Sequence, residues 1–158
     1  MQLTILGVDP GEQTGVGIVR VGAQAPFRVE IATSMFARDF PNWVRNLLQT
    51  NAIDGFAIED WTFYRGPRGK AGAAQAAFAV GRVVGALEGV GVQRWVELKR
   101  PTILSALGLK ASADKAACEG AVRMLTDLKG NHNDHVWDAV AVAIAGAGRF
   151  NAVMAVGS

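Results

Sequence analysis

The chain has 158 residues, half of them hydrophobic, and a formal net charge of +2. This length and composition predict one folded domain over residues 1–158 and exclude an intrinsically disordered chain. Cys118 is the only cysteine, which excludes an internal disulfide, a zinc site built of thiolates and an iron–sulfur cluster. The longest apolar run, residues 139–148, is about half of the ~20 residues that a membrane-spanning helix needs. With no signal-peptide pattern at the N-terminus either, we expect a cytoplasmic protein.

Basic residues are concentrated in the middle of the chain. Residues 61–110 hold eight lysines and arginines against two glutamates. This imbalance favours a polyanionic partner such as nucleic acid, although ordinary solvated charges would give the same count. The segment 61–70 also contains aromatic side chains, which either stack on bases or pack back into the core. The residues of this segment that we expect to contact DNA are Trp61, Phe63, Tyr64, Arg65, Arg68 and Lys70.

The first third of the chain predicts three strands, at residues 3–8, 14–21 and 27–33. The links between them are too short for a parallel crossover, so we expect an antiparallel meander. The alternation of the third segment directs the side chains of Phe27, Val29 and Ile31 to the core.

Helix and strand patterns alternate in the rest of the chain. We expect helices over residues 39–51, 71–90, 100–107, 113–125 and 135–148, and strands over 55–59 and 92–98. Asp39 and Ser112 are expected to cap the first and the fourth of these helices. The order predicts an α/β or α+β domain with a mixed sheet of about five strands and helices on both faces. Gly81, Gly85 and Gly89 recur at helical spacing and allow close packing, either within the monomer or at a dimer seam.

Carboxylates end two of the predicted strands. Asp9 and Glu59 follow apolar runs, and in neighbouring parallel strands their side chains would emerge at the same edge of the sheet. His135 and Asp138 are three residues apart and therefore lie on one face of the first turn of the last helix. Placed over the same edge, this turn would bring three carboxylates and an imidazole together.

Such a cluster needs a cation, because buried carboxylates repel each other and are costly to desolvate. Oxygen ligands with one imidazole favour Mg²⁺ or Mn²⁺. Two such ions about 4 Å apart suit in-line hydrolysis of a phosphodiester, in which one activates water and the other stabilises the leaving oxygen. The plainer alternatives are that Asp138 is a helix-start carboxylate and Asp9 a turn residue.

The chain resembles the RuvC-type Holliday-junction resolvases of the ribonuclease H-like superfamily. The matching segments are residues 5–11 with Thr14 and Gly15, then 57–59, 112–115 and 135–144. The resemblance implies a ribonuclease H-like fold and a homodimer that binds four-way DNA junctions, and possibly other branched DNA, and nicks two strands symmetrically. It also implies a metal site of Asp9, Glu59, His135 and Asp138, with Lys115 contacting DNA near the scissile phosphate. Lys99, Arg100 and Lys110 are further expected DNA contacts.

Other features distinguish this chain from the usual family pattern. Thr62 stands where the family has an aromatic wedge, so Trp61, Phe63 or Tyr64 would have to replace it, and we favour a phage or otherwise divergent resolvase in a bacterial cell or infected host. Asp60 and Asp134 lie beside presumed ligands and would join or tune the metal shell. One alternative is a fragment of an actin-like kinase, because residues 7–15 also resemble the phosphate-binding turn of such kinases. Another is a junction-binding protein without catalysis.

Overall fold

A computed structural model describes residues 2–60 and 69–156, and its centre is a five-stranded mixed sheet. The strands are β1 (Leu3–Asp9), β2 (Gln13–Val21), β3 (Arg28–Phe36), β4 (Gly55–Glu59) and β5 (Val96–Leu98), in the spatial order β3-β2-β1-β4-β5. The first three strands form an antiparallel meander, and β4 and β5 add in parallel to β1. This confirms the predicted mixed sheet.

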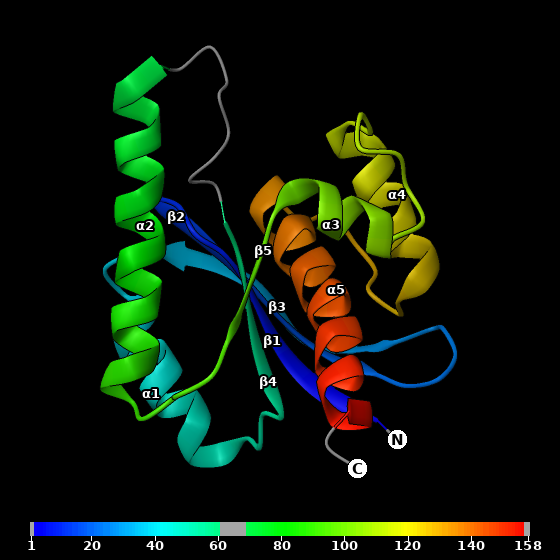
Figure 1. The fold of residues 1–158 in the computed structure, drawn as a ribbon, viewed down its shortest axis with the longest axis horizontal. Coiled ribbons are helices and arrows are strands. Elements are labelled where there is room, and N and C mark those ends of the chain that lie inside the picture. The colour runs from blue at the N-terminus through cyan, green and yellow to red at the C-terminus, as the bar shows by residue number, and fades with distance from the viewer. Residues whose placement is uncertain (1, 61–68, 157–158) are drawn as a thin grey trace.

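Helices cover both faces of the sheet (Figure 1). They are α1 (Phe40–Thr50), α2 (Gly69–Gly89), α3 (Arg100–Ala106), α4 (Lys115–Leu125) and α5 (Asp134–Val156). One buried cluster joins the sheet to α1 and α2, and a second joins the other face to α3, α4 and α5. Within the described residues, no helix combines the length and the hydrophobicity needed to cross a membrane.

Helix α5 lies directly against the sheet, because small residues line both surfaces. A side-chain carbon added to Gly7 of β1 would lie 2.2 Å from the carbonyl oxygen of Ala139. On the helix side, residues 139–143 are all fully buried alanines and valines. A helix that is apolar on every side in this way belongs in the interior. Its first turn is thereby held at the carboxyl ends of β1 and β4.

The predicted inward side of β3 is wrong for one residue. Val29 packs against the α5-side core as expected, but Ile31 packs against the α1-side core. The register shifts between the pairs Ile18–Ile31 and Val19–Val29, which leaves Glu30 as the extra residue of a β-bulge. One inserted residue reverses the alternation of a strand, so Val29 and Ile31 face opposite sides.

Several predicted boundaries differ from the structure; strand β3, for example, continues to Phe36, three residues beyond its predicted end. The last strand begins at Val96, not at residue 92, because only Val96–Leu98 pair with β4. Residues 92–95 connect α2 to this strand, and Val92 and Trp95 pack against the core. Asp114, not Ser112, caps α4, since its Oδ1 accepts from the backbone N–H of Ala117 at 2.8 Å. Helix α5 continues beyond Gly148, where Phe150 still packs against the core. Asp39 takes the predicted cap position of α1 but makes no side-chain cap bond.

Candidate active site

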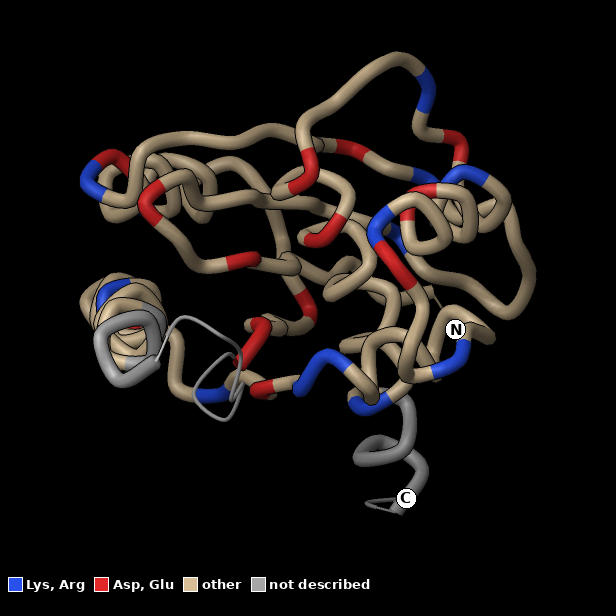
Figure 2. The backbone as a smooth tube through the Cα atoms, turned by 90° about the horizontal axis from the view of Figure 1, so that it is seen from above, with Lys and Arg blue, Asp and Glu red and all other residues tan. Residues whose placement is uncertain are grey.

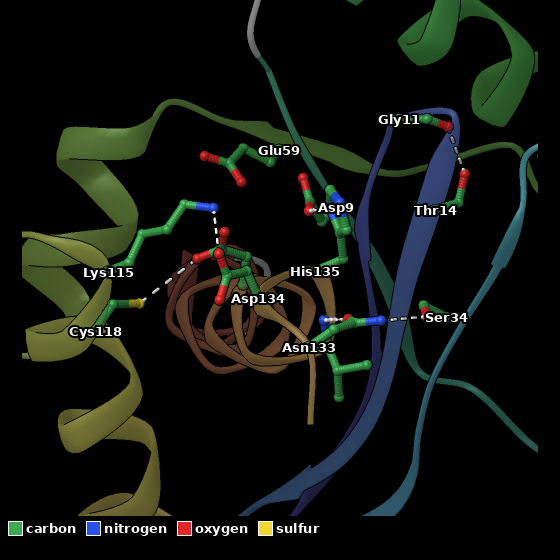
Figure 3. A network of polar contacts seen from close by, with 12 residues as sticks. Asp9, Gly11, Thr14, Ser34, Glu59, Lys115, Cys118, Asn133, Asp134 and His135 are labelled. Carbon is green, nitrogen blue, oxygen red and sulfur yellow. Dashed lines mark hydrogen bonds and ion pairs between the residues drawn. The ribbon is translucent and has the colours of Figure 1, made fainter. Parts of the chain in front are cut away.

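Two carboxylates meet where β1 and β4 end. The two strands are parallel, with Val8 paired to Ile58, so Asp9 and Glu59 follow at the same level of the sheet. Both side chains are buried: Asp9 is 3% exposed and Glu59 is fully enclosed. The expected juxtaposition of the two strand ends is therefore present (Figure 3).

The first turn of α5 brings the other two predicted residues to this edge. His135 Nδ1 lies 2.8 Å from Asp9 Oδ2, and Asp138 is buried one turn further along the helix. Asn133 fixes the start of the helix: its Oδ1 accepts from the backbone N–H of Val136 at 3.1 Å, and its Nδ2 donates to Ser34 Oγ at 2.8 Å (Figure 3). The structure thus collects three acidic residues and one histidine from three separate elements.

Arg100, at the start of α3, also enters this cluster. Its Nη1 donates to Asp138 Oδ1 at 2.8 Å and lies 3.8 Å from Glu59 Oε1. Burial lowers the Arg100 pKa, but the hydrogen bond and charge of Asp138 and then the charge of Glu59 together outweigh it. The Arg100 pKa is therefore raised. Arg100 was predicted as a DNA contact, and the structure places it among the carboxylates.

Glu59 is the least satisfied group of the described residues. Neither of its buried carboxylate oxygens has a hydrogen-bond partner, and Arg100 is too distant to donate one. Burial first, then the charges of Asp9 and Asp138, raise the Glu59 pKa to about 9. A buried carboxylate without a hydrogen-bond donor is costly, so this position calls for a cation that supplies positive charge and a ligand bond.

His135 is held by Asp9 and half-exposed. Its hydrogen bond to Asp9 raises the His135 pKa, against burial and the nearby Lys115, which lower it. The Asp9 carboxylate contacts Nδ1 and thereby orients the His135 ring, and Nε2 takes no part in this contact. Orientation of a histidine by a carboxylate is common in metal sites.

Lys115 and Asp134 form an exposed ion pair at the rim of the cluster, with Nζ and Oδ2 2.7 Å apart (Figure 3). The hydrogen bond between them raises the Lys115 pKa and lowers the Asp134 pKa. Lys115 therefore remains charged next to the buried carboxylates. Figure 2 shows basic positions close to acidic ones at several places along the backbone, so the net positive charge is not confined to one face.

The donor set fits Mg²⁺ or Mn²⁺ better than a softer ion. Carboxylates and one imidazole are the available ligands, and the buried Cys118 is not a thiolate at neutral pH, because burial and then the Asp138 charge raise its pKa to about 11. Among the described residues, however, no three His, Cys, Asp or Glu side chains converge on one point as they stand. Arg100 and His135 hold two of the carboxylates instead.

The remaining predicted DNA contacts fall in different places. Lys99 and Lys110 are exposed on either side of α3, and Lys70 lies in the first turn of α2. The others lie outside the described residues, and so does Thr62, the position of the expected wedge; they are Trp61, Phe63, Tyr64, Arg65 and Arg68.

Sequence reasoning missed three residues that shape the site. Arg100 was expected only as a DNA contact, since a partner 38 positions away leaves no local pattern. Cys118 places its Sγ 3.8 Å from Asp138 Oδ1, a contact without a sequence signal. Asn133 precedes the helix by one residue and is a recognisable cap type, so the N-cap preference for asparagine would have found it.

Comparisons with known proteins agree with this geometry. The family model described as crossover junction endodeoxyribonuclease RuvC matches residues 5–146. Thermus thermophilus RuvC in complex with a Holliday junction substrate superposes with a TM-score of 0.80 at 24% identity, covering 97% of this chain and 96% of that one. A second Thermus thermophilus RuvC structure gives 0.76 at 24% identity, covering 96% of each chain. No curated protein sequence matches significantly.

The two structural matches establish the ribonuclease H-like fold that the sequence predicted. The family match extends over both strand-end carboxylates and the first turn of α5, and it favours the resolvase prediction over the kinase-like alternative. The chain therefore belongs to the RuvC family of crossover junction endodeoxyribonucleases.

Proposed function

We propose that this crossover junction endodeoxyribonuclease cuts four-way DNA junctions by paired symmetric nicks, using Mg²⁺ or Mn²⁺ bound at the cluster of Asp9, Glu59, His135 and Asp138. The observation that carries the proposal is the Glu59 carboxylate, buried without a hydrogen-bond partner between two other acidic residues. A structural carboxylate would be paired or hydrogen-bonded at such a position. A ligand-binding carboxylate is left unsatisfied by the protein itself.

The residues have separate tasks in this proposal. Asp9, Glu59 and Asp138 supply oxygen ligands from three elements, so that the site forms only in the folded chain. His135 supplies the imidazole ligand, and Asp9 orients its ring through the 2.8 Å contact. Two divalent ions would supply the Lewis acidity for in-line hydrolysis of the phosphodiester. Asp134 keeps Lys115 directed at the rim and does not itself bind the ion.

Branched DNA is the proposed partner, since a related RuvC is solved with a Holliday junction substrate. Lys115 would contact a phosphate next to the cleaved bond, where its raised pKa keeps it charged. Lys99 and Lys110 would contact the backbone further out, together with Lys70 and the aromatic and basic residues of 61–68. We place this activity in the cytoplasm of a bacterial cell or phage-infected host.

The test is cleavage of a synthetic four-way junction and of a linear duplex of the same sequence, each with Mg²⁺, Mn²⁺ or EDTA. We expect metal-dependent nicks at symmetric positions of the junction and far slower cutting of the duplex. Junction binding without cleavage in Mn²⁺ would support the inactive junction-binding alternative and refute the nuclease proposal. Cleavage in EDTA would refute the metal requirement.

Lys115→Ala is expected to slow junction cleavage at least tenfold and to lower the salt dependence of junction binding by about one charge. The reason is the loss of one cation at the proposed phosphate contact, next to the buried carboxylates. Affinity measured at several salt concentrations gives the slope. Lys129→Ala removes the same charge from an exposed loop position and serves as the control. Equal slopes in the two variants would remove Lys115 from the interface.

A homodimer through α2 is the proposed assembly. Gly81, Gly85 and Gly89 are exposed. Apart from the helix's own backbone, no described atom lies within 4 Å of a side-chain carbon built on any of them, so the described part of the monomer does not pack against them. Phe78 is 64% exposed on the same helix. Together these residues, with the Arg82 guanidinium 4.5 Å from the centre of the Phe78 ring, form an exposed face that a second α2 could approach closely.

Phe78→Asp is expected to convert this dimer to monomers at micromolar concentration, because it puts a charge into the apolar seam. Light scattering during size-exclusion chromatography measures the mass. Phe36→Asp alters another exposed phenylalanine, at the end of β3, and is expected to leave the dimer intact. An unchanged mass in Phe78→Asp would place the interface elsewhere.

A further inference from the structure

Arg100 lies between two of the proposed metal ligands. Its Nη1 is 2.8 Å from Asp138 Oδ1 and 3.8 Å from Glu59 Oε1, and its side chain is only 17% exposed. The contact with Asp138 is therefore shielded from water, where an ion pair is much stronger than at the surface. In this arrangement, the guanidinium supplies positive charge to both carboxylates.

The neighbouring cations are engaged with other carboxylates. Lys115 Nζ is 2.7 Å from Asp134 Oδ2, and His135 Nδ1 is 2.8 Å from Asp9 Oδ2. Among the described residues, neither forms an ion pair with Asp138 or Glu59. Asp138 and Glu59 thus share Arg100 as their nearest cation, although Glu59 receives no hydrogen bond from it. The Lys115 charge acts on both carboxylates from further away.

A divalent ion and the guanidinium would compete for this position. An ion shared by Glu59 and Asp138 would have to lie near the atoms that Nη1 now approaches, within a few ångströms of a second positive charge. At such a separation in a buried site, like charges repel strongly. Arg100 lies in the first turn of a seven-residue helix outside the sheet, and rotation about the bonds of its long side chain would be enough for it to withdraw.

We propose that Arg100 is a resident counter-cation of the active site, which leaves Asp138 when a divalent ion binds and thereby sets the metal concentration at which the site assembles. This inference rests on the proposed function, because it takes Asp138 and Glu59 to be metal ligands. The metal then binds only the fraction of molecules in which Arg100 has withdrawn. The apparent dissociation constant is raised by the inverse of that fraction.

The first test is a calorimetric Mn²⁺ titration of the full chain without DNA. Arg100→Gln removes the competing charge, and we expect it to bind Mn²⁺ about tenfold more tightly than the wild-type chain. Arg94→Gln makes the same charge change at an exposed position and should bind like the wild type. Equal or weaker Mn²⁺ binding by Arg100→Gln than by Arg94→Gln would overturn the proposal. Failure of all three proteins to bind Mn²⁺ would instead refute the metal site itself.

A second test uses the wild-type chain, so it does not depend on how a variant folds. The NMR signal of the Arg100 Nε–Hε group is assigned as the one that is missing from the spectra of both Arg100→Gln and Arg100→Lys. Saturation with diamagnetic Mg²⁺ is expected to shift this signal toward that of a solvated arginine and to speed its exchange with water. A signal that keeps its position and its slow exchange in Mg²⁺ would show that Arg100 stays on Asp138, and would overturn the proposal.

Discussion

Glu59→Gln is expected to abolish junction cleavage and, without metal, to raise the melting temperature of the protein. Cleavage should fall by at least about a hundredfold, since even residues that only support metal ligands contribute 10–100-fold. Stability at alkaline pH should rise because glutamine keeps the shape of the side chain but cannot acquire the buried charge that Glu59 takes on there. A residue that destabilises the fold while serving the reaction is typical of an active site.

The pH dependence separates this effect from an ordinary surface change. The Glu59 pKa is raised from 4.5 to about 9, so between these values the folded metal-free protein binds more protons than the unfolded chain. Its stability therefore falls as pH rises through this window. His135, whose pKa is also raised, contributes in the same direction above its unfolded pKa of 6.5. Glu59→Gln removes the larger part of this loss and leaves the His135 part.

Thermal unfolding in EDTA at several pH values measures the change. Near pH 9, the gain in Glu59→Gln is on the order of a few kcal/mol, or roughly 10 °C. Glu97→Gln, on the neighbouring strand β5, is the control, because this glutamate is exposed. If Glu59→Gln cuts junctions at the wild-type rate, or melts lower than the wild type near pH 9, the carboxylate has a structural partner and the metal role is wrong.

The other two carboxylates are expected to follow the cleavage result but not the stability result. Asp9→Asn and Asp138→Asn should each lose cutting, with junction affinity within a few fold of the wild type, because ligands and DNA contacts are different residues. Each variant also loses an ion pair, to His135 or to Arg100, so no stabilisation is expected. Loss of folding together with affinity would indicate a structural role.

The four proposed metal ligands could be predicted from the sequence. Asp9 and Glu59 were predictable because each ends an apolar run, and the parallel pairing of β1 and β4 follows from the helical crossover between them. His135 and Asp138 were predictable from their spacing of three residues on a helix. These inferences use local patterns and simple topology. They locate the site but do not indicate which cations balance the charges of its carboxylates.

What the sequence could not predict depends on contacts between distant segments. Arg100 was expected to contact DNA, and no local pattern indicates that the packing of α3 against α5 brings it to Asp138. The bulge at Glu30 reverses β3 with no glycine or proline to mark it. Ser112 and Asp114 are both good cap residues, and only the direction of the chain entering α4 selects Asp114. In each case local propensity allows several outcomes and tertiary packing selects one.

Gly15→Ala is expected to destabilise the protein by about 3 kcal/mol and to reduce cleavage at least a hundredfold, although residue 15 bears no reactive group. Gly15 pairs with Asp9 across β1 and β2, and the first turn of α5 crosses it. A side-chain carbon at this position would overlap the carbonyl oxygen of His135, at 1.9 Å, and its carbonyl carbon, at 2.5 Å. Both are backbone atoms, so relief requires the helix start to move away from the sheet.

That displacement acts on the site through His135. Because its ring contacts Asp9 over 2.8 Å, a shift of the first turn by about an ångström separates the pair and moves Asp138 with it. Gly22→Ala is the control: it lies just after the same strand, and no described atom is within 4 Å of the added carbon. Thermal unfolding and junction cleavage are measured on both variants. Wild-type cleavage by Gly15→Ala would show that the reaction does not need His135 at Asp9, and the proposed ligand set would then be wrong.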